Sequence, residues 1–80
     1  MTREEIIREL TPIAAEVFQM PDLILADDLS AENVETWTSL AFMQLLTSIE
    51  EKFGFKFKMM ELIQLKTMGD IIDAMMRHLS

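Results

Sequence analysis

The chain has very few residues that usually turn or break secondary structure: two glycines and two prolines among 80 residues. A β-sheet protein of this size needs many tight turns, which glycine and proline commonly supply. Half of the residues are hydrophobic, which is too many for a disordered segment even though the net charge is −7. The sequence therefore predicts an all-α protein with a single domain over residues 1–80.

Charge and composition argue against several classes of function. Fourteen acidic residues against seven basic ones disfavour nucleic-acid binding, because a phosphate backbone would repel the chain. Cysteine is absent, which excludes disulfides, thiolate metal sites and a cysteine nucleophile. No apolar run reaches the roughly 18 residues of a membrane span, and the first residues lack the order of a secretion signal. We expect a cytoplasmic protein with no nucleic-acid partner and no membrane span.

The first helix is expected to begin next to Thr2, because Thr2 and Glu5 have the spacing of a capping box. Apolar residues then recur at three- and four-residue steps. Pro12 lies inside this stripe and removes a backbone hydrogen bond, which predicts a kink or a restart of the helix with Thr11 as its cap. Pro21 is expected to end the segment. The stripe consists of Ile6, Ile7, Leu10, Ile13, Ala14, Val17 and Phe18.

Residues 21–38 mix acidic and apolar side chains without periodicity, so we expect a long loop that packs across the helices. The second main helix is expected over residues 39–53 and should end at Gly54. Leu40 and Ala41 fall on its polar side near the start, where apolar side chains can mark a contact surface. The buried face is expected to hold Phe42, Met43, Leu45, Leu46, Ile49 and Phe53.

The last third of the chain predicts one short and one longer helix. Residues 55–58 alternate apolar and basic side chains like an extended segment, and residues 59–65 allow a short helix. Thr67 and Asp70 form a second capping-box pattern, with Asp where Glu is usual. The chain should thus have three main helices, one short helix and a long first loop.

Two motifs stand at the expected helix starts. Trp-Thr-Ser-Leu at residues 37–40 precedes a helix that ends in Ser-Ile-Glu-Glu-Lys-Phe-Gly, and Thr-Met-Gly-Asp at residues 67–70 opens the last helix. This ordered combination resembles the acyl carrier proteins. Their hallmark is Asp-Ser-Leu, often preceded by Trp in specialised members, before a helix ending in an acidic pair and Phe. The resemblance covers nearly the whole chain and implies an all-α, four-helix acyl-carrier-type bundle.

The resemblance implies that Ser39 carries a covalent 4′-phosphopantetheine, whose thiol holds acyl or aminoacyl groups as thioesters. A helix start suits this attachment, because unpaired amides and the helix dipole favour a phosphate. The implied role is not enzymatic: the protein would deliver these groups between enzymes of a fatty-acid, polyketide or other specialised biosynthetic pathway. The implied partners are a phosphopantetheinyl transferase that uses coenzyme A and magnesium, an acyl- or aminoacyl-loading enzyme, and downstream acyl-processing enzymes. We expect the carrier to be a monomer.

The sequence departs from the family pattern around Ser39. Thr38 replaces the family's Asp, the start of the second helix is not acidic, and the usually acidic region after it is basic and apolar over residues 56–60. These changes weaken generic electrostatic docking. They leave two hypotheses: a specialised carrier with its own partners, or an unmodified helical protein-interaction module derived from the carrier fold. We expect partner recognition at Trp37, Thr38, Leu40, Ala41, Gln44 and Thr47.

Other interpretations of single residues remain open. Ser39 can be a simple N-cap. A serine hydrolase would need a base near Ser39, but the only histidine is His78 and nothing resembles a nucleophile elbow. The acids of the first loop lack the spacing of an EF-hand. Trp37 is expected to anchor that loop, with an indole N–H that needs an acceptor. Met43, Met68, Met75 and Met76 are expected to line the core, either as gap fillers or to admit an acyl chain.

Overall fold

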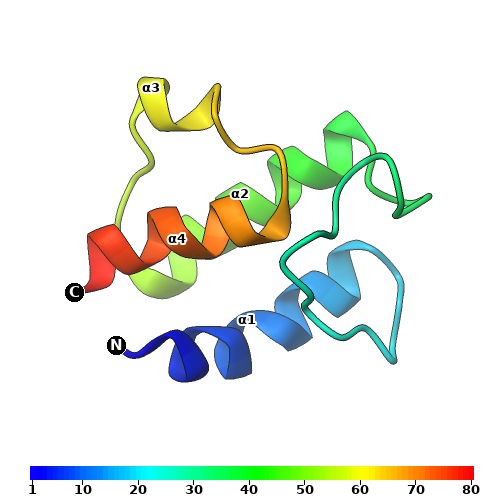
Figure 1. Cartoon of the computed structure of the whole chain (residues 1–80), viewed down its shortest axis with the longest axis horizontal. Coiled ribbons are helices and arrows are strands. Elements are labelled where there is room, and N and C mark those ends of the chain that lie inside the picture. Colours follow the sequence, from blue (N-terminus) through cyan, green and yellow to red (C-terminus); the bar gives the residue numbers. More distant parts are fainter.

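The computed structural model describes residues 1–80 and shows four helices in the order α1 (Arg3–Val17), α2 (Ser39–Phe53), α3 (Met59–Leu62) and α4 (Met68–Leu79). The only β-type pairing is an isolated bridge between Ser30 and Thr67. α1 packs against both α2 and α4, and α4 lies between α1 and the short α3 in the view of Figure 1. The prediction of an all-α, four-helix bundle is confirmed.

The predicted start and stop signals form as expected. Thr2 Oγ1 accepts a hydrogen bond from the Glu5 N–H, and the Glu5 carboxylate accepts one from the Thr2 N–H. Thr67 and Asp70 form the same reciprocal pair at the start of α4. Gly54 ends α2 with a φ of +76°, a left-handed conformation that glycine adopts without strain. Local chemistry therefore sets the ends of these helices.

α1 runs without interruption through Pro12, so a restart at Thr11 is wrong. The Thr11 hydroxyl donates to the Ile7 carbonyl at 2.6 Å instead of capping a new helix. Leu10 and Ala14, on either side of the proline, are fully buried, and this packing holds the helix together despite the missing hydrogen bond. α1 ends at Val17, four residues before Pro21.

The long loop packs across the helices, as predicted. Its apolar side chains Leu23, Leu25 and Val34 belong to the buried core. The start of α4 is bonded to the loop, because the Met68 and Gly69 N–H groups donate to loop carbonyls at 2.8 and 2.9 Å. The loop therefore has a defined position against α4, and it approaches the start of α2 in Figure 1.

The expected buried face of α2 is wrong at two positions. Ala41 is 7% exposed and belongs to the core, whereas Met43 is 56% exposed. With about 100° per residue, the buried arc runs from Ala41 through Leu45 and Ile49 to Leu46. Met43 lies beyond the end of this arc, so its apolar character led to the wrong assignment.

The structure of the segment after α2 agrees in part with the alternating apolar and basic pattern of its sequence. Residues 55–58 are extended without forming a strand; Phe57 is buried and its neighbouring lysines are exposed. α3 is shorter than the predicted 59–65 and contributes no buried side chain. None of the four helices has the length and apolar character needed to cross a membrane.

Candidate functional site

Ser39 is the first residue of α2, and its side chain is exposed. The N-cap is Thr38, whose Oγ1 accepts a hydrogen bond from the Ala41 N–H at 3.1 Å. The interpretation of Ser39 as a simple N-cap is therefore wrong. Because Thr38 performs the capping, the Ser39 hydroxyl has no structural hydrogen bond and is free for another role.

The start of α2 offers a favourable place for an anion. The backbone N–H groups of Ser39 and Leu40 donate to no protein atom, and the first turn of α2 contains no acidic residue. A helix start with unpaired amides carries a partial positive charge. A phosphate attached to the Ser39 hydroxyl therefore meets unpaired donors and no carboxylate within its own helix turn.

The other three helices contain an acid in their first turn. The Thr2 backbone N–H lowers the pKa of the Glu5 carboxyl, and the Lys66 backbone N–H lowers the pKa of Asp70 against the opposing effect of partial burial. In α3, burial works to raise the pKa of Glu61, but bonds from the Lys58 N–H and His78 outweigh it and the pKa is lowered. α2 thus differs from the other helices at the position of Ser39.

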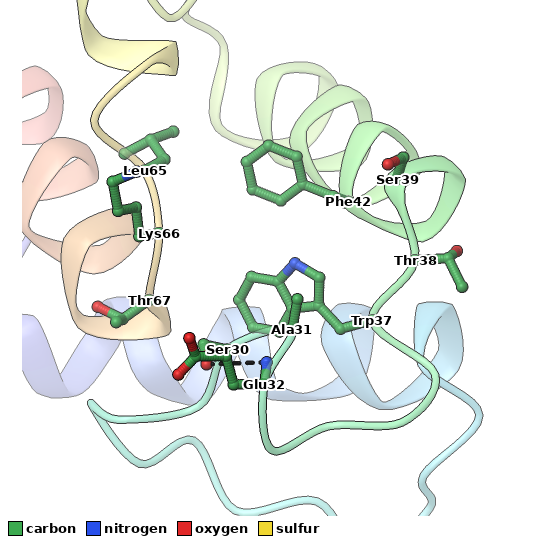
Figure 2. Close-up of a pocket in the computed structure, with 10 residues that line it drawn as sticks. All are labelled: Ser30, Ala31, Glu32, Trp37, Thr38, Ser39, Phe42, Leu65, Lys66 and Thr67. Atoms are coloured by element: carbon green, nitrogen blue, oxygen red, sulfur yellow. Dashed lines mark hydrogen bonds between the residues drawn. The ribbon is translucent and has the colours of Figure 1, made fainter.

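A cleft of about 560 Å³ lies beside Ser39, between the start of α2, the end of the long loop and the segment before α4 (Figure 2). Its apolar wall comes from Trp37, Phe42 and Leu65, and its rim carries hydroxyl groups and one charge of each sign. The remaining lining residues are Ser30, Ala31, Glu32, Thr38, Lys66 and Thr67. The volume falls in the range of about 300–1,000 Å³ that is usual for small-molecule sites.

Trp37 forms part of an aromatic stack that includes one wall of this cleft. Its ring centroid lies 5.0 Å from that of Phe18 and 6.1 Å from that of Phe42, with interplanar angles below 20° in both pairs. Trp37 is 7% exposed and Phe18 is fully buried. The ring anchors the end of the loop to the core, as predicted, and gives Trp37 little surface for a partner.

The residues predicted to recognise partners do not all lie together. Leu40, Gln44 and Thr47 are exposed on the same side of α2, whereas the burial of Ala41 removes it from this surface. Gln44 and Thr47 line a second cleft, between α1 and α2, and not the cleft beside Ser39. Exposed Met43 also lines this second cleft and was missed, because its apolar side chain had been assigned to the core.

His78 lies in the last turn of α4, and its Nε2 atom is 2.7 Å from Glu61 Oε1. Its ring stacks on Phe55 with centroids 4.5 Å apart. These contacts tie α3 to α4. This pairing could not be predicted from the sequence, because Glu61 and His78 belong to different helices. Of the four methionines expected in the core, Met68 and Met75 are fully buried.

The acids of the first loop are exposed, and Asp27 pairs with Arg3 at 2.6 Å. Arg3 also bonds to Asp73 of α4 at 2.8 Å, and both carboxylates raise the pKa of the Arg3 guanidinium through hydrogen bonds. Asp27 therefore takes part in a structural ion pair that joins α1, the loop and α4.

A small four-helix bundle with an exposed serine at a helix start is the architecture of a carrier domain. The family model described as "phosphopantetheine attachment site" matches residues 8–75. The chain is 32% identical over 73 residues to acyl carrier proteins of Coprothermobacter proteolyticus and Acidothermus cellulolyticus, covering 91% of this chain and 89% and 87% of theirs.

The chain also resembles a solved structure, the holo acyl carrier protein of Geobacter metallireducens determined by solution NMR. The TM-score is 0.81 at 35% identity, over 89% of this chain and 82% of that one. The chain belongs to the acyl carrier protein family. It is a carrier without catalytic activity of its own, it takes a covalent 4′-phosphopantetheine, and its role implies a phosphopantetheinyl transferase and acyl-processing enzymes as partners.

Proposed function

We propose that the 4′-phosphopantetheine group is attached to Ser39. The observation that carries this proposal is the exposed Ser39 hydroxyl at the first residue of α2, next to two unpaired amides and without an acid in the same turn. The other serines fit less well: Ser30 and Ser48 are half-buried, and Ser80 follows the end of α4. The residues around Ser39 therefore fit the group that the family carries.

In the loading step, the Ser39 oxygen forms a bond to the phosphorus of the pantetheine-bearing phosphate of coenzyme A. The pyrophosphate bond breaks, 3′,5′-ADP leaves with that electron pair, and the hydroxyl proton passes to the transferase. Once bound, the group supplies a thiol that holds acyl or aminoacyl cargo as a thioester. The helix start stabilises the phosphodiester charge, and exposure of Ser39 gives the transferase access.

The proposal is tested by intact-mass spectrometry after co-expression with phosphopantetheinyl transferases of broad specificity. The wild-type chain should gain the mass of one phosphopantetheinyl group, and Ser39→Ala should gain none. Ser48→Ala, in the same helix, is the matched control and should load like the wild type. Loading of Ser39→Ala, or no loading of the wild type by any transferase, would contradict the proposal and favour an unmodified interaction module.

We further propose that the exposed side of α2 recognises partner enzymes through Leu40, Gln44 and Thr47, together with Met43. Leu40 follows Ser39 directly and is 69% exposed, so an enzyme that reaches the serine must meet this side chain. Exposed apolar residues at the centre of a docking surface supply most of the binding energy once water is excluded. Thr38, which is exposed and directly precedes Ser39, completes the surface on the loop side.

Replacing Leu40 by Ala should lower kcat/KM of the transferase about tenfold, as expected for loss of about 1.4 kcal/mol of contact energy. The control is Ile24→Ala, because Ile24 is 81% exposed but lies in the long loop. Steady-state loading assays should show the loss for Leu40→Ala alone. Equal loss in both variants would mean that general surface apolarity, and not this site, determines docking.

The cargo belongs to a fatty-acid, polyketide or other specialised pathway. The non-acidic start of α2 and the Trp at position 37 favour a dedicated specialised pathway with its own loading enzyme. We propose that the carrier works as a monomer in the cytoplasm, where coenzyme A and the transferase are available.

A further inference from the structure

The indole N–H of Trp37 has no acceptor within the protein. The Trp37 side chain is 7% exposed, yet its nitrogen takes part in no hydrogen bond, and Figure 2 shows that nitrogen on the edge of the ring that is turned toward Phe42. No fully buried side-chain nitrogen or oxygen lacks a partner, so this N–H is accessible to solvent, and Trp37 is one of the residues that line the cleft. An indole N–H in a mostly buried ring usually has a partner, and this one is available to a bound acceptor.

The surroundings of this donor fit a thin chain with carbonyl groups. The cleft places Ser39 at its edge, the rings of Trp37 and Phe42 along one wall, and Leu65 with Thr67 opposite (Figure 2). Apolar walls with a few convergent polar groups are typical of small-molecule sites. A pantetheine arm contains two amide carbonyls, and a loaded arm adds a thioester carbonyl, all of which accept hydrogen bonds.

The aromatic wall of the cleft continues into the core. Phe42 stacks on Trp37, and Trp37 stacks on the fully buried Phe18. A long acyl chain entering the core from this cleft would have to separate these rings and fill the space between well-packed side chains. A short acyl group could stay in the cleft without disturbing them.

We propose that this cleft binds the pantetheine arm together with a short acyl group, that the Trp37 indole N–H donates to one of their carbonyl oxygens, and that the Phe18–Trp37–Phe42 stack keeps long acyl chains out of the core. The inference rests on the proposed attachment at Ser39 and adds a cargo class to it. Trp37 acts here as a positioning residue and Phe42 as a determinant of cargo length.

The first test follows the indole proton by ¹H–¹⁵N NMR. Trp37 is the only tryptophan, so the spectrum contains one indole signal. The apo, holo and acetyl forms are each verified by intact mass. Relative to the apo form, the holo or the acetyl form should show a downfield shift and slower solvent exchange of this proton. A change on going from apo to holo assigns an amide carbonyl of the arm as acceptor, and a change only on acetylation assigns the thioester carbonyl.

An indole signal that stays the same in all verified forms would overturn the inference and leave attachment at Ser39 intact. Failure of Ser39 to load would be seen by mass and would overturn both. Trp37→Phe keeps a ring in the stack but removes the donor. Where acetylation alone changes the indole signal, the acetyl thioester of this variant should be cleaved several-fold faster by hydroxylamine, because it is no longer held in the cleft. An equal rate would then contradict a hydrogen bond to the thioester carbonyl.

The second test concerns cargo length. A lauroyl group should leave the melting temperature of the wild type at the value of the acetyl form, whereas it should raise that of Phe42→Ala, in which the stack is shortened. Phe42→Leu removes the ring with less loss of volume and serves if the alanine variant does not fold. A lauroyl group that raises the melting temperature of the wild type would show that the core admits long chains.

Discussion

Thr38 has two consequences for Ser39. Its side-chain oxygen caps α2 through the Ala41 N–H, which holds Ser39 in the first helical turn with a free hydroxyl. The threonine also leaves the site without the carboxylate that precedes the serine in the family's usual motif. Because Asp caps a helix as well as Thr does, the two roles can be separated by substitution.

Thr38→Asp should keep the stability within about 0.5 kcal/mol and increase kcat/KM of a general transferase several-fold at low salt, since the new charge attracts a basic docking surface. Thr38→Asn provides the same cap without the charge and should load at the wild-type rate. The advantage of the Asp variant should disappear at high ionic strength. Equal rates for Asp and Asn at low salt would show that the missing carboxylate does not limit loading.

At the scale of the helices, acidic side chains that accept backbone hydrogen bonds make the stability of the fold depend on pH. Asp70 accepts from the N–H groups of Lys66 and Thr67 at 3.0 and 3.1 Å, and its pKa lies below the ordinary value of 3.8. Its contribution to stability is therefore complete above the unfolded-state pKa and is lost as the pH falls through the folded-state value. Glu5 and Glu61 act in the same direction at α1 and α3.

Asp70→Asn should lower the free energy of unfolding by about 1 kcal/mol at pH 7. The difference from the wild type should shrink as the pH falls below 3.8, the ordinary value of the carboxyl, and should be lost once the folded-state carboxyl takes up its proton. Urea titrations at several pH values measure both effects. The control is Asp22→Asn, an exposed loop carboxylate without a hydrogen-bond partner, for which no loss is expected. A difference that persists unchanged at low pH would contradict the role of the charged form.

The starts of α1 and α4 and both ends of α2 were predicted well from the sequence because their signals are local, whereas the ends of α1 and α3 were not. Residues 39–53 were correct at both ends, since a capping threonine and a left-handed glycine define them. Which face of α2 is buried was less predictable. Ala41 is buried by packing within the core, whereas Met43 lies outside the buried arc. The tendency of Pro12 to break the helix was overridden, because Leu10 and Ala14 on either side of it are buried. Contacts between distant segments, such as Glu61 with His78, leave no periodic pattern.

The candidate site was only partly predictable for the same reason. Ser39 and the anchoring role of Trp37 followed from a motif and from ring chemistry. The cleft was not foreseen, because it depends on how the segment before α4 lies beside the start of α2. The stack of Phe18, Trp37 and Phe42 likewise joins three parts of the chain that only the tertiary fold brings together.

At the scale of the whole molecule, a net charge of −7 on a body of 30 × 25 × 21 Å produces mutual repulsion. Arg3 offsets a little of it by joining Asp27 and Asp73, but both carboxylates are mostly exposed and such pairs contribute little. Raising the ionic strength from about 0.01 to about 0.15 M shortens the screening length from about 30 to about 8 Å. The melting temperature should therefore rise. A fall would mean that the ion pairs of Arg3 outweigh the repulsion.

The proposed carrier role of this protein depends on where the phosphopantetheinyl group is attached. The peptide from Glu9 to Lys52, released by trypsin from the loaded protein, contains Ser30, Ser39 and Ser48. Fragment-ion mass spectrometry of this peptide locates the group directly. We predict that fragments containing Ser39 carry the added mass and that fragments lacking Ser39 do not. Fragments that place it on Ser30 or Ser48, or a peptide that never gains mass with any transferase, would contradict the account.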